Sequence, residues 1–227
     1  MVDLDGEGML ALWNGVDPSR QREYDIWHSH EHVPERISVP GMLGARRYKR
    51  MAGPLPEYLT LYSMLDTDVL RSEPYQKLLD GPTEWSRSMR PAFRGFTRLC
   101  CRRVASYGGG VGGVLCAILV DDTVDLRSTE LHRALRGLPT RDPFVAVHVI
   151  ERDTSVPDVP FRIGGDAPDL PDHGAILVEG FDEAILRDGI PDILAALDVS
   201  NIGAATTLTT YRLAYALDIA SLGRLIS

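Results

Sequence analysis

The stretch DPSRQREYDIWHSHEHVPERISVPGMLGARRY (Asp17–Tyr48) concentrates ionisable and aromatic side chains more than any other part of the chain, and three of the six histidines lie within five of its residues. Asp17 followed by Pro18 is typical of a helix N-cap with proline in the first turn. A proline biases the residue before it away from helical backbone. The pattern therefore predicts a helix that ends near Val33, just before Pro34.

A polar stripe lies on one face of this predicted helix. His28, Glu31 and His32 are three and four residues apart and share that face, whereas His30 points elsewhere. By spacing alone, a solvated helix face is the commoner interpretation of such a stripe. A metal site is not expected, because Pro34 stands where the zinc-protease pattern His-Glu-x-x-His needs its second histidine.

Length and charge limit the class of protein. The 227 residues suffice for one large domain or two small ones, and a net charge of −8 argues against general nucleic-acid binding. Residues 1–107 carry 15 basic and 14 acidic side chains, against 9 and 18 in residues 108–227, so the first half is the more suitable host for an anionic ligand.

The chain has no apolar run of membrane-spanning length, and it starts with an acidic segment where a signal peptide is basic. We therefore expect no membrane association and a cytoplasmic location. The three cysteines, Cys100, Cys101 and Cys116, are odd in number and lack a C-x-x-C spacing, so we expect no disulfide framework. Their expected role is to fill strand positions.

Hydrophobic periodicity predicts the order strand, helix, strand, strand, helix, strand, and then the same order again. The first set comprises strands at Gly8–Val16, Met42–Met51, Tyr58–Leu65 and Phe96–Val104, with helices at Asp17–Val33 and Asp66–Leu79 and a loop containing Trp85 and Pro91. The second comprises strands at Gly113–Asp122, Phe144–Arg152, His173–Asp182 and Ala204–Tyr215, with helices at Val124–Leu138 and Glu183–Leu197 and a proline-rich insertion at Ser155–Asp172.

This order predicts an α+β fold of two tandem ferredoxin-like units, residues 1–107 and 108–227. Each such unit leaves one face of its sheet open, so we expect the open faces to close into a barrel, either within the chain or with a second copy. The glycine-rich join Tyr107–Val114 matches G-x-G-x-x-G spacing, but it opens a strand and not a helix. We therefore interpret it as a linker and reject a dinucleotide site.

One run in the first half resembles a known signature. The run W-H-x-x-E-H-x-P-E-R-x-x-x-P-G, from Trp27 to Gly41, resembles the first-helix signature of EthD-like proteins in the dimeric α/β-barrel superfamily. The match covers about residues 24–48, and elsewhere in the first half it rests on element order. The resemblance implies binding of small organic molecules. Relatives include lactone isomerases, polyketide cyclases, aldoxime dehydratases, cofactorless monooxygenases and haem enzymes.

The second half keeps a single histidine, His132, in its first helix and has nothing like E-H-x-P-E-R. We therefore interpret residues 1–107 as the site-bearing unit and residues 108–227 as a degenerate copy that completes the fold. On this interpretation His132, His148 and His173 have no functional role.

The candidate catalytic residues are His32, Glu35 and Arg46. An imidazole titrates near neutral pH, so His32 is the candidate general base or acid, with Glu31 or Glu35 holding its tautomer. Arg46 is expected to bind a carboxylate, enolate or phenolate oxygen. A salt bridge from Arg46 to Glu31 or Glu35 is the structural alternative. The candidate substrate-binding residues are Trp13, Trp27, His28, Tyr48, which faces the same side of its strand as Arg46, and Tyr62.

Three functions follow as hypotheses. The first is a cofactor-independent enzyme that moves a proton on a small aromatic or acidic metabolite, as an isomerase, cyclase or lyase does. The second is a non-catalytic binding or scaffold module, and the third, implied by the resemblance, is a haem-binding protein or monooxygenase. An enzyme should enclose a cavity into which both His32 and Arg46 point, whereas a scaffold would fill that space. The expected partner is a small organic molecule, with a homodimer or an internal pseudo-dimer as the assembly.

Overall fold

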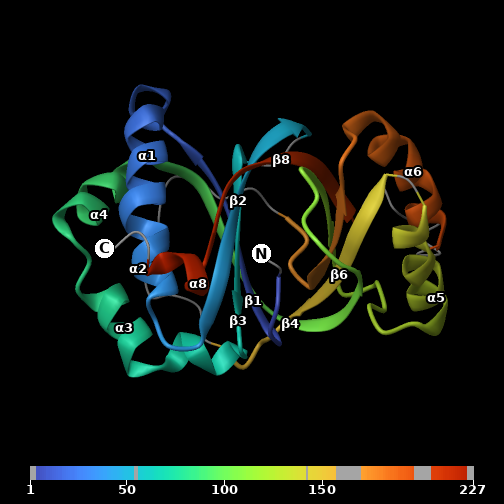
Figure 1. The fold of residues 1–227 in the computed structure, drawn as a ribbon, viewed down its shortest axis with the longest axis horizontal. Coiled ribbons are helices and arrows are strands. Elements are labelled where there is room, and N and C mark those ends of the chain that lie inside the picture. The colour runs from blue at the N-terminus through green and yellow to red at the C-terminus, as the bar shows by residue number, and fades with distance from the viewer. Residues whose placement is uncertain (1–3, 54–55, 142, 157–169, 197–205, 224–227) are drawn as a thin grey trace.

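The computed structural model of the chain describes residues 4–53, 56–141, 143–156, 170–196 and 206–223 (Figure 1). Its strands form one closed antiparallel barrel in the order β1-β3-β2-β8-β5-β7-β6-β4. The strands of the first half are β1 (Gly8–Val16), β2 (Met42–Ala52), β3 (Tyr58–Met64) and β4 (Phe93–Gly108). Those of the second half are β5 (Val114–Val120), β6 (Phe144–Arg152), β7 (Gly174–Gly180) and β8 (Thr206–Asp218).

The barrel closes within one chain. The two halves contribute sheets of matching order, β4-β1-β3-β2 and β8-β5-β7-β6, and the pairs β2–β8 and β4–β6 join them. The predicted α+β fold with a dimeric α/β-barrel arrangement is therefore confirmed, in its single-chain form. The glycine-rich join connects β4 directly to β5, which agrees with a linker and not with a strand-to-helix nucleotide loop.

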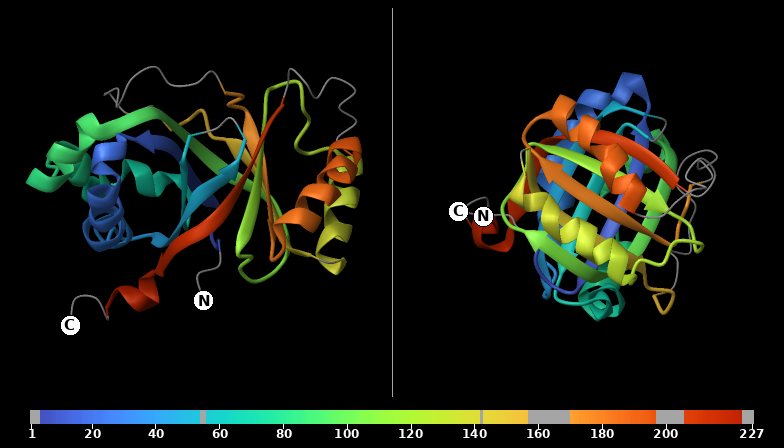
Figure 2. Two further views of the ribbon diagram at one scale, coloured as in Figure 1. Left: turned by 90° about the horizontal axis from the view of Figure 1, so that it is seen from above. Right: turned by 90° about the vertical axis from the view of Figure 1, so that its right-hand side faces the viewer.

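Helices cover the outside of the barrel on two opposite sides (Figure 2). The first sheet carries α1 (Gln21–Trp27), a π-helical turn (His28–His32), α2 (Val33–Ile37), α3 (Glu73–Asp80) and α4 (Glu84–Met89). The second sheet carries α5 (Thr129–Gly137) and α6 (Glu183–Ala196), and a short helix, α8 (Ile219–Leu222), follows β8 and contacts α2. None of the helices in the described residues is long and apolar enough to cross a membrane.

Strand alternation divides the side chains between the barrel interior and the helices. In β1, Met9, Ala11 and Trp13 belong to the apolar cluster inside the barrel, whereas Leu10 packs in the cluster under the helices. All eight strands contribute buried residues to the interior cluster, so the barrel is packed with side chains. Open space for a ligand must therefore be sought between a sheet and its helices.

The predicted end of the first helix is wrong. The helix continues past Val33 to Ile37, because the π-helical turn at His28–His32 interrupts the α-helical ladder and α2 starts afresh. Pro34 then lies in the first turn of α2, where its missing N–H loses no hydrogen bond. The change matters for function, since it adds one further turn to the face that carries His28 and His32.

Other boundaries differ as well. The expected helix at Asp66–Leu79 starts as a 3₁₀ turn (Thr67–Arg71) and continues as α3, and α5 starts five residues later than expected. The expected loop around Trp85 contains α4, and β4 is longer than expected at both ends. Most of the proline-rich insertion, Leu197 and the predicted start of the last strand at Ala204 lie outside the described residues.

Candidate functional site

A cavity of about 80 Å³ lies between the first-half sheet and the helices that cover it. We call it the helix–sheet cavity. Its wall is mainly aromatic and aliphatic. The charged side chains in the wall are arginines, and none of the described residues that line it is an aspartate or glutamate. The lining residues are Leu10, Leu12, Asn14, Tyr24, Trp27, His28, His32, Arg36, Thr60, Tyr75, Leu79, Pro82, Ser86, Arg90, Phe93, Phe96 and Arg98.

Two histidines of the helix face this cavity. The indole of Trp27 stacks on the ring of His32, with centroids 4.5 Å apart and planes 30° apart, and thereby fixes the imidazole orientation. His28 Nε2 lies 3.4 Å from the hydroxyl oxygen of Thr60. The Nδ1 atoms of both histidines are buried and have no hydrogen-bond partner among the described residues. Buried polar atoms without partners are uncommon, so these two are candidates for ligand contacts.

Both imidazoles are neutral at pH 7. Burial lowers the pKa of His28 well below its usual value, and the charge of Arg47 adds to the effect. Burial also lowers the pKa of His32 well below its usual value, helped by Arg36 and Arg90. The His32 residue is partly exposed, but its Nδ1 atom is buried and therefore lies in a region of low dielectric constant. An uncharged imidazole at this place has a lone pair available to accept a proton.

The two glutamates of the helix do not orient His32. Glu31 Oε1 accepts hydrogen bonds from Trp27 Nε1 at 3.1 Å, Thr83 Oγ1 at 2.6 Å and Ser86 Oγ at 3.3 Å, so it ties α4 to the first helix. Glu35 is partly buried, and burial raises its pKa. Neither carboxylate hydrogen-bonds to His32 among the described residues, so the predicted tautomer-holding role is not observed; stacking on Trp27 orients the ring.

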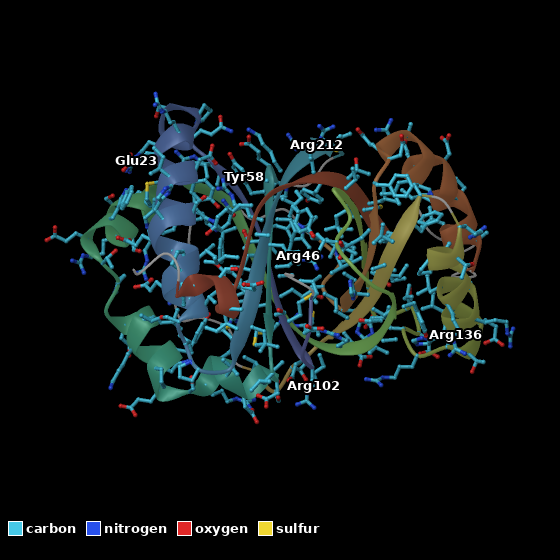
Figure 3. The ribbon with its side chains drawn as sticks, viewed as in Figure 1. Glu23, Arg46, Tyr58, Arg102, Arg136 and Arg212 are labelled. Carbon is cyan, nitrogen blue, oxygen red and sulfur yellow. The ribbon has the colours of Figure 1, made fainter. Side chains whose placement is uncertain are left out.

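Arg46 lies on the other side of the sheet, inside the barrel (Figure 3). Its Nη1 atom is 2.6 Å from Glu179 Oε1, and both side chains are fully buried. Burial alone lowers the pKa of Arg46, but Tyr48 and Glu179 outweigh it and raise the pKa. The expected meeting of Arg46 with His32 is therefore wrong, and so is the alternative bridge to the helix glutamates, because strand parity turns position 46 inward.

The sequence-predicted residues thus fall into two groups. Trp27, His28 and His32 line the helix–sheet cavity, and Tyr62 lies just beneath it. Trp13 and Tyr48 join Arg46 in the barrel interior, where they pack and do not face a ligand space. Glu35 is not among the residues that line the cavity.

Sequence reasoning missed the cations of the cavity, Arg36, Arg90 and Arg98. Arg36 was inside the quoted signature but beyond the predicted helix end. Its spacing carried a signal, since it stands four residues after His32 and eight after His28, on one helical face. Ser86 and Arg90 come from the segment expected to be a loop, where Thr83 caps α4 by accepting a 3.0 Å hydrogen bond from the Ser86 amide.

Space in the second half is used differently. Leu131 and Leu135 of α5 and Leu186 and Ile190 of α6 pack directly on strand residues such as Ile176 in one continuous cluster. Histidines there are bonded: His132 contacts Tyr107 OH at 2.6 Å, and His148 contacts Glu179 at 3.2 Å. In the described residues, no group of three or more His, Cys, Asp or Glu is placed to hold a metal ion.

No protein-family model matches the chain, and no curated protein matches it in sequence. Solved structures do match over nearly the whole length. An anthrone oxidase-like protein has a TM-score of 0.60 at 11% identity, with 96% of this chain and 95% of that chain covered. A candidate monooxygenase from Fusobacterium nucleatum has a TM-score of 0.56 at 7% identity, with coverage of 94% and 95%. A heme-binding protein from Thermus thermophilus has a TM-score of 0.53 at 10% identity, with coverage of 94% and 93%. The structural similarity shows a shared dimeric α/β-barrel fold, and at such low sequence identity it shows the fold alone.

Proposed function

We propose that the helix–sheet cavity binds a small aromatic molecule and that His32 moves a proton on it without a cofactor. The observation that carries the proposal is the pair of neutral imidazoles with buried, unpartnered Nδ1 atoms in a largely aromatic wall. Catalytic sites combine such a cavity with a few polar groups of perturbed pKa.

The charge balance of the cavity favours an acidic substrate. Arg36, Arg90 and Arg98 line it, and no carboxylate among the described residues does. A proton on His32 would add a further positive charge beside Arg36 and Arg90, which already lower its pKa. A substrate that carries or develops negative charge offsets this cost, so proton transfer to His32 becomes favourable when such a substrate is bound.

The reaction step is proton abstraction from carbon next to a carbonyl group. The C–H bond breaks, the proton goes to a ring nitrogen of His32, and the electron pair forms a C=C bond while the carbonyl oxygen becomes an enolate. Return of the proton to another atom gives isomerisation. Elimination or ring closure from the same enolate gives the lyase and cyclase outcomes.

The haem-binding or monooxygenase alternative has support from the fold, which the chain shares with a heme-binding protein and a candidate monooxygenase. Of the two residues expected to point into the cavity of an enzyme, His32 does so and Arg46 does not. A scaffold would pack this space, as the second half does. An engineered cavity of roughly 150 Å³ in another protein binds benzene, against about 80 Å³ here. A single aromatic ring must therefore displace lining side chains or extend through the opening, and haem would have to do so to a much greater extent. Membership of the EthD-like group stays a prediction that rests on residues 24–48.

Phenylpyruvate is a suitable probe, since it joins one aromatic ring, a carboxylate and an acidic methylene group. We expect the protein to bind it and to accelerate exchange of the methylene protons in D₂O, followed by NMR. The His32→Gln variant should lose at least a hundredfold of that acceleration. His30→Gln is the matched control, because His30 is exposed and its Nδ1 bonds to the Ile26 carbonyl at 3.0 Å. Equal exchange with and without the wild-type protein would refute the proposal.

A further inference from the structure

A second, smaller space of about 20 Å³ continues the helix–sheet cavity toward the sheet. We call it the inner recess. It shares Leu10, Leu12, His32, Arg36 and Tyr75 with the wall of the larger cavity and adds Met42 and Tyr62 at its floor. A space of this size exceeds the roughly 10–15 Å³ that one water-sized group needs.

Three of the residues that line this recess carry a buried polar atom without a partner in the described structure. Arg36 Nη1, Tyr62 OH and His32 Nδ1 are each buried and have no hydrogen-bond partner among the described residues. Arg36 is 8% exposed and Tyr62 is 1% exposed, so water outside the protein does not solvate them. Arg36 contacts the ring of Tyr75, 5.7 Å from its centroid, and no carboxylate in the described part of the chain lines the recess beside it.

The three side chains act on one another. After burial, the charge of Arg36 is the largest influence on the pKa of both Tyr62 and His32. Burial raises the pKa of Tyr62, so its hydroxyl keeps its proton and can donate. Arg36 is a permanent cation and donor. The residues that line the inner recess thus include two donors, one of them charged, and a neutral imidazole.

Leaving such groups unpaired is costly, since a buried donor without an acceptor costs about 1–3 kcal/mol. An anionic oxygen in the recess would satisfy Arg36 and Tyr62 together. We propose that the inner recess is an oxyanion subsite, in which Arg36 and Tyr62 bind the negatively charged oxygen of an aromatic ligand beside His32. This inference rests on the proposed function of the helix–sheet cavity and names the substrate class for it: aromatic acids and enolates.

The test compares benzoate with benzamide, which has the same shape and no charge, by calorimetric titration. We expect benzoate to bind the wild-type protein at least tenfold more tightly than benzamide. Tyr62→Phe should weaken benzoate binding about tenfold and leave benzamide within twofold, because a hydrogen bond to a charged group is lost. Arg36→Met should remove the preference for benzoate. Both variants should unfold at or above the wild-type temperature, since each removes an unsatisfied buried group.

Tyr211→Phe is the matched control. Its hydroxyl is also buried, but it lies inside the barrel, away from the inner recess. Its loss should leave both dissociation constants unchanged. Equal binding of benzoate and benzamide, or equal weakening of both by Tyr62→Phe, would overturn the subsite while the cavity stands. Failure of every aromatic probe to bind would overturn the proposed function as well.

Discussion

Replacing Arg46 by methionine should destabilise the barrel and leave the ligand site intact. The Arg46 and Glu179 side chains are fully buried, and Glu179 also accepts bonds from His148 Nε2 at 3.2 Å and the Gly112 amide at 2.9 Å. The arginine is on β2 and the glutamate on β7, so the pair links the two halves across the interior. Its loss leaves an uncompensated buried carboxylate, which costs about 3–5 kcal/mol.

Urea unfolding measures this loss. With a denaturant slope of about 2 kcal/mol per molar, the midpoint of Arg46→Met should fall by about 1.5–2.5 M. The double variant Arg46→Met/Glu179→Leu removes both charges and should recover most of the stability. Arg127→Met is the control: its side chain is 63% exposed, so its bridge to Glu151 contributes less than about 1 kcal/mol. Near-wild-type stability of Arg46→Met together with lost benzoate binding would refute the reasoning and return Arg46 to the site.

Three further outcomes are expected. His32→Gln should bind benzoate within threefold of wild type while its exchange activity disappears, and parallel loss of both would indicate a disturbed cavity. The pKa values of His28 and His32 are lowered in the folded state, so below pH 6.5 the unfolded chain takes up protons that the folded protein does not. As the pH decreases below 6.5, the free energy of unfolding should decrease by about 1.4 kcal/mol per pH unit for each histidine. Urea midpoints at pH 7.5 and 5.5 measure this decrease, and equal midpoints would contradict it. Gly41→Ala should lower the melting temperature, since its φ is +94° and a Cβ would meet Val69 Cγ2 at 2.5 Å, whereas Gly113→Ala, with open space around it, should not.

Element order was predictable because strands and helices in this chain follow their periodicities closely. In β3, Tyr58 and Tyr62 face the helices while Leu59 and Leu61 face the barrel, as alternation requires. Closure within one chain was not predictable, since the same open sheets also close between two copies. It depends on the pairing of β2 with β8 and of β4 with β6, which no local pattern encodes.

Part of the site was predictable for the same reason. His28 and His32 share a helical face, and the structure turns that face toward the sheet. The expectation for Arg46 is wrong because alternation along the strand places Arg46 on the inward face, and the barrel interior on that face is packed with side chains. Arg36 was not predicted because Pro34 indicates a helix end near Val33, whereas the helix continues to Ile37. A π-helical turn depends on tertiary packing, so helix-ending rules applied to sequence do not reveal it.

The most direct test of the central claim is the electron density of crystals grown with saturating benzoate. We expect a ring in the helix–sheet cavity next to His32, with the carboxylate within hydrogen-bonding distance of Arg36 Nη1 and Tyr62 OH. A cavity closed by side chains, or benzoate bound only elsewhere on the protein, would contradict it.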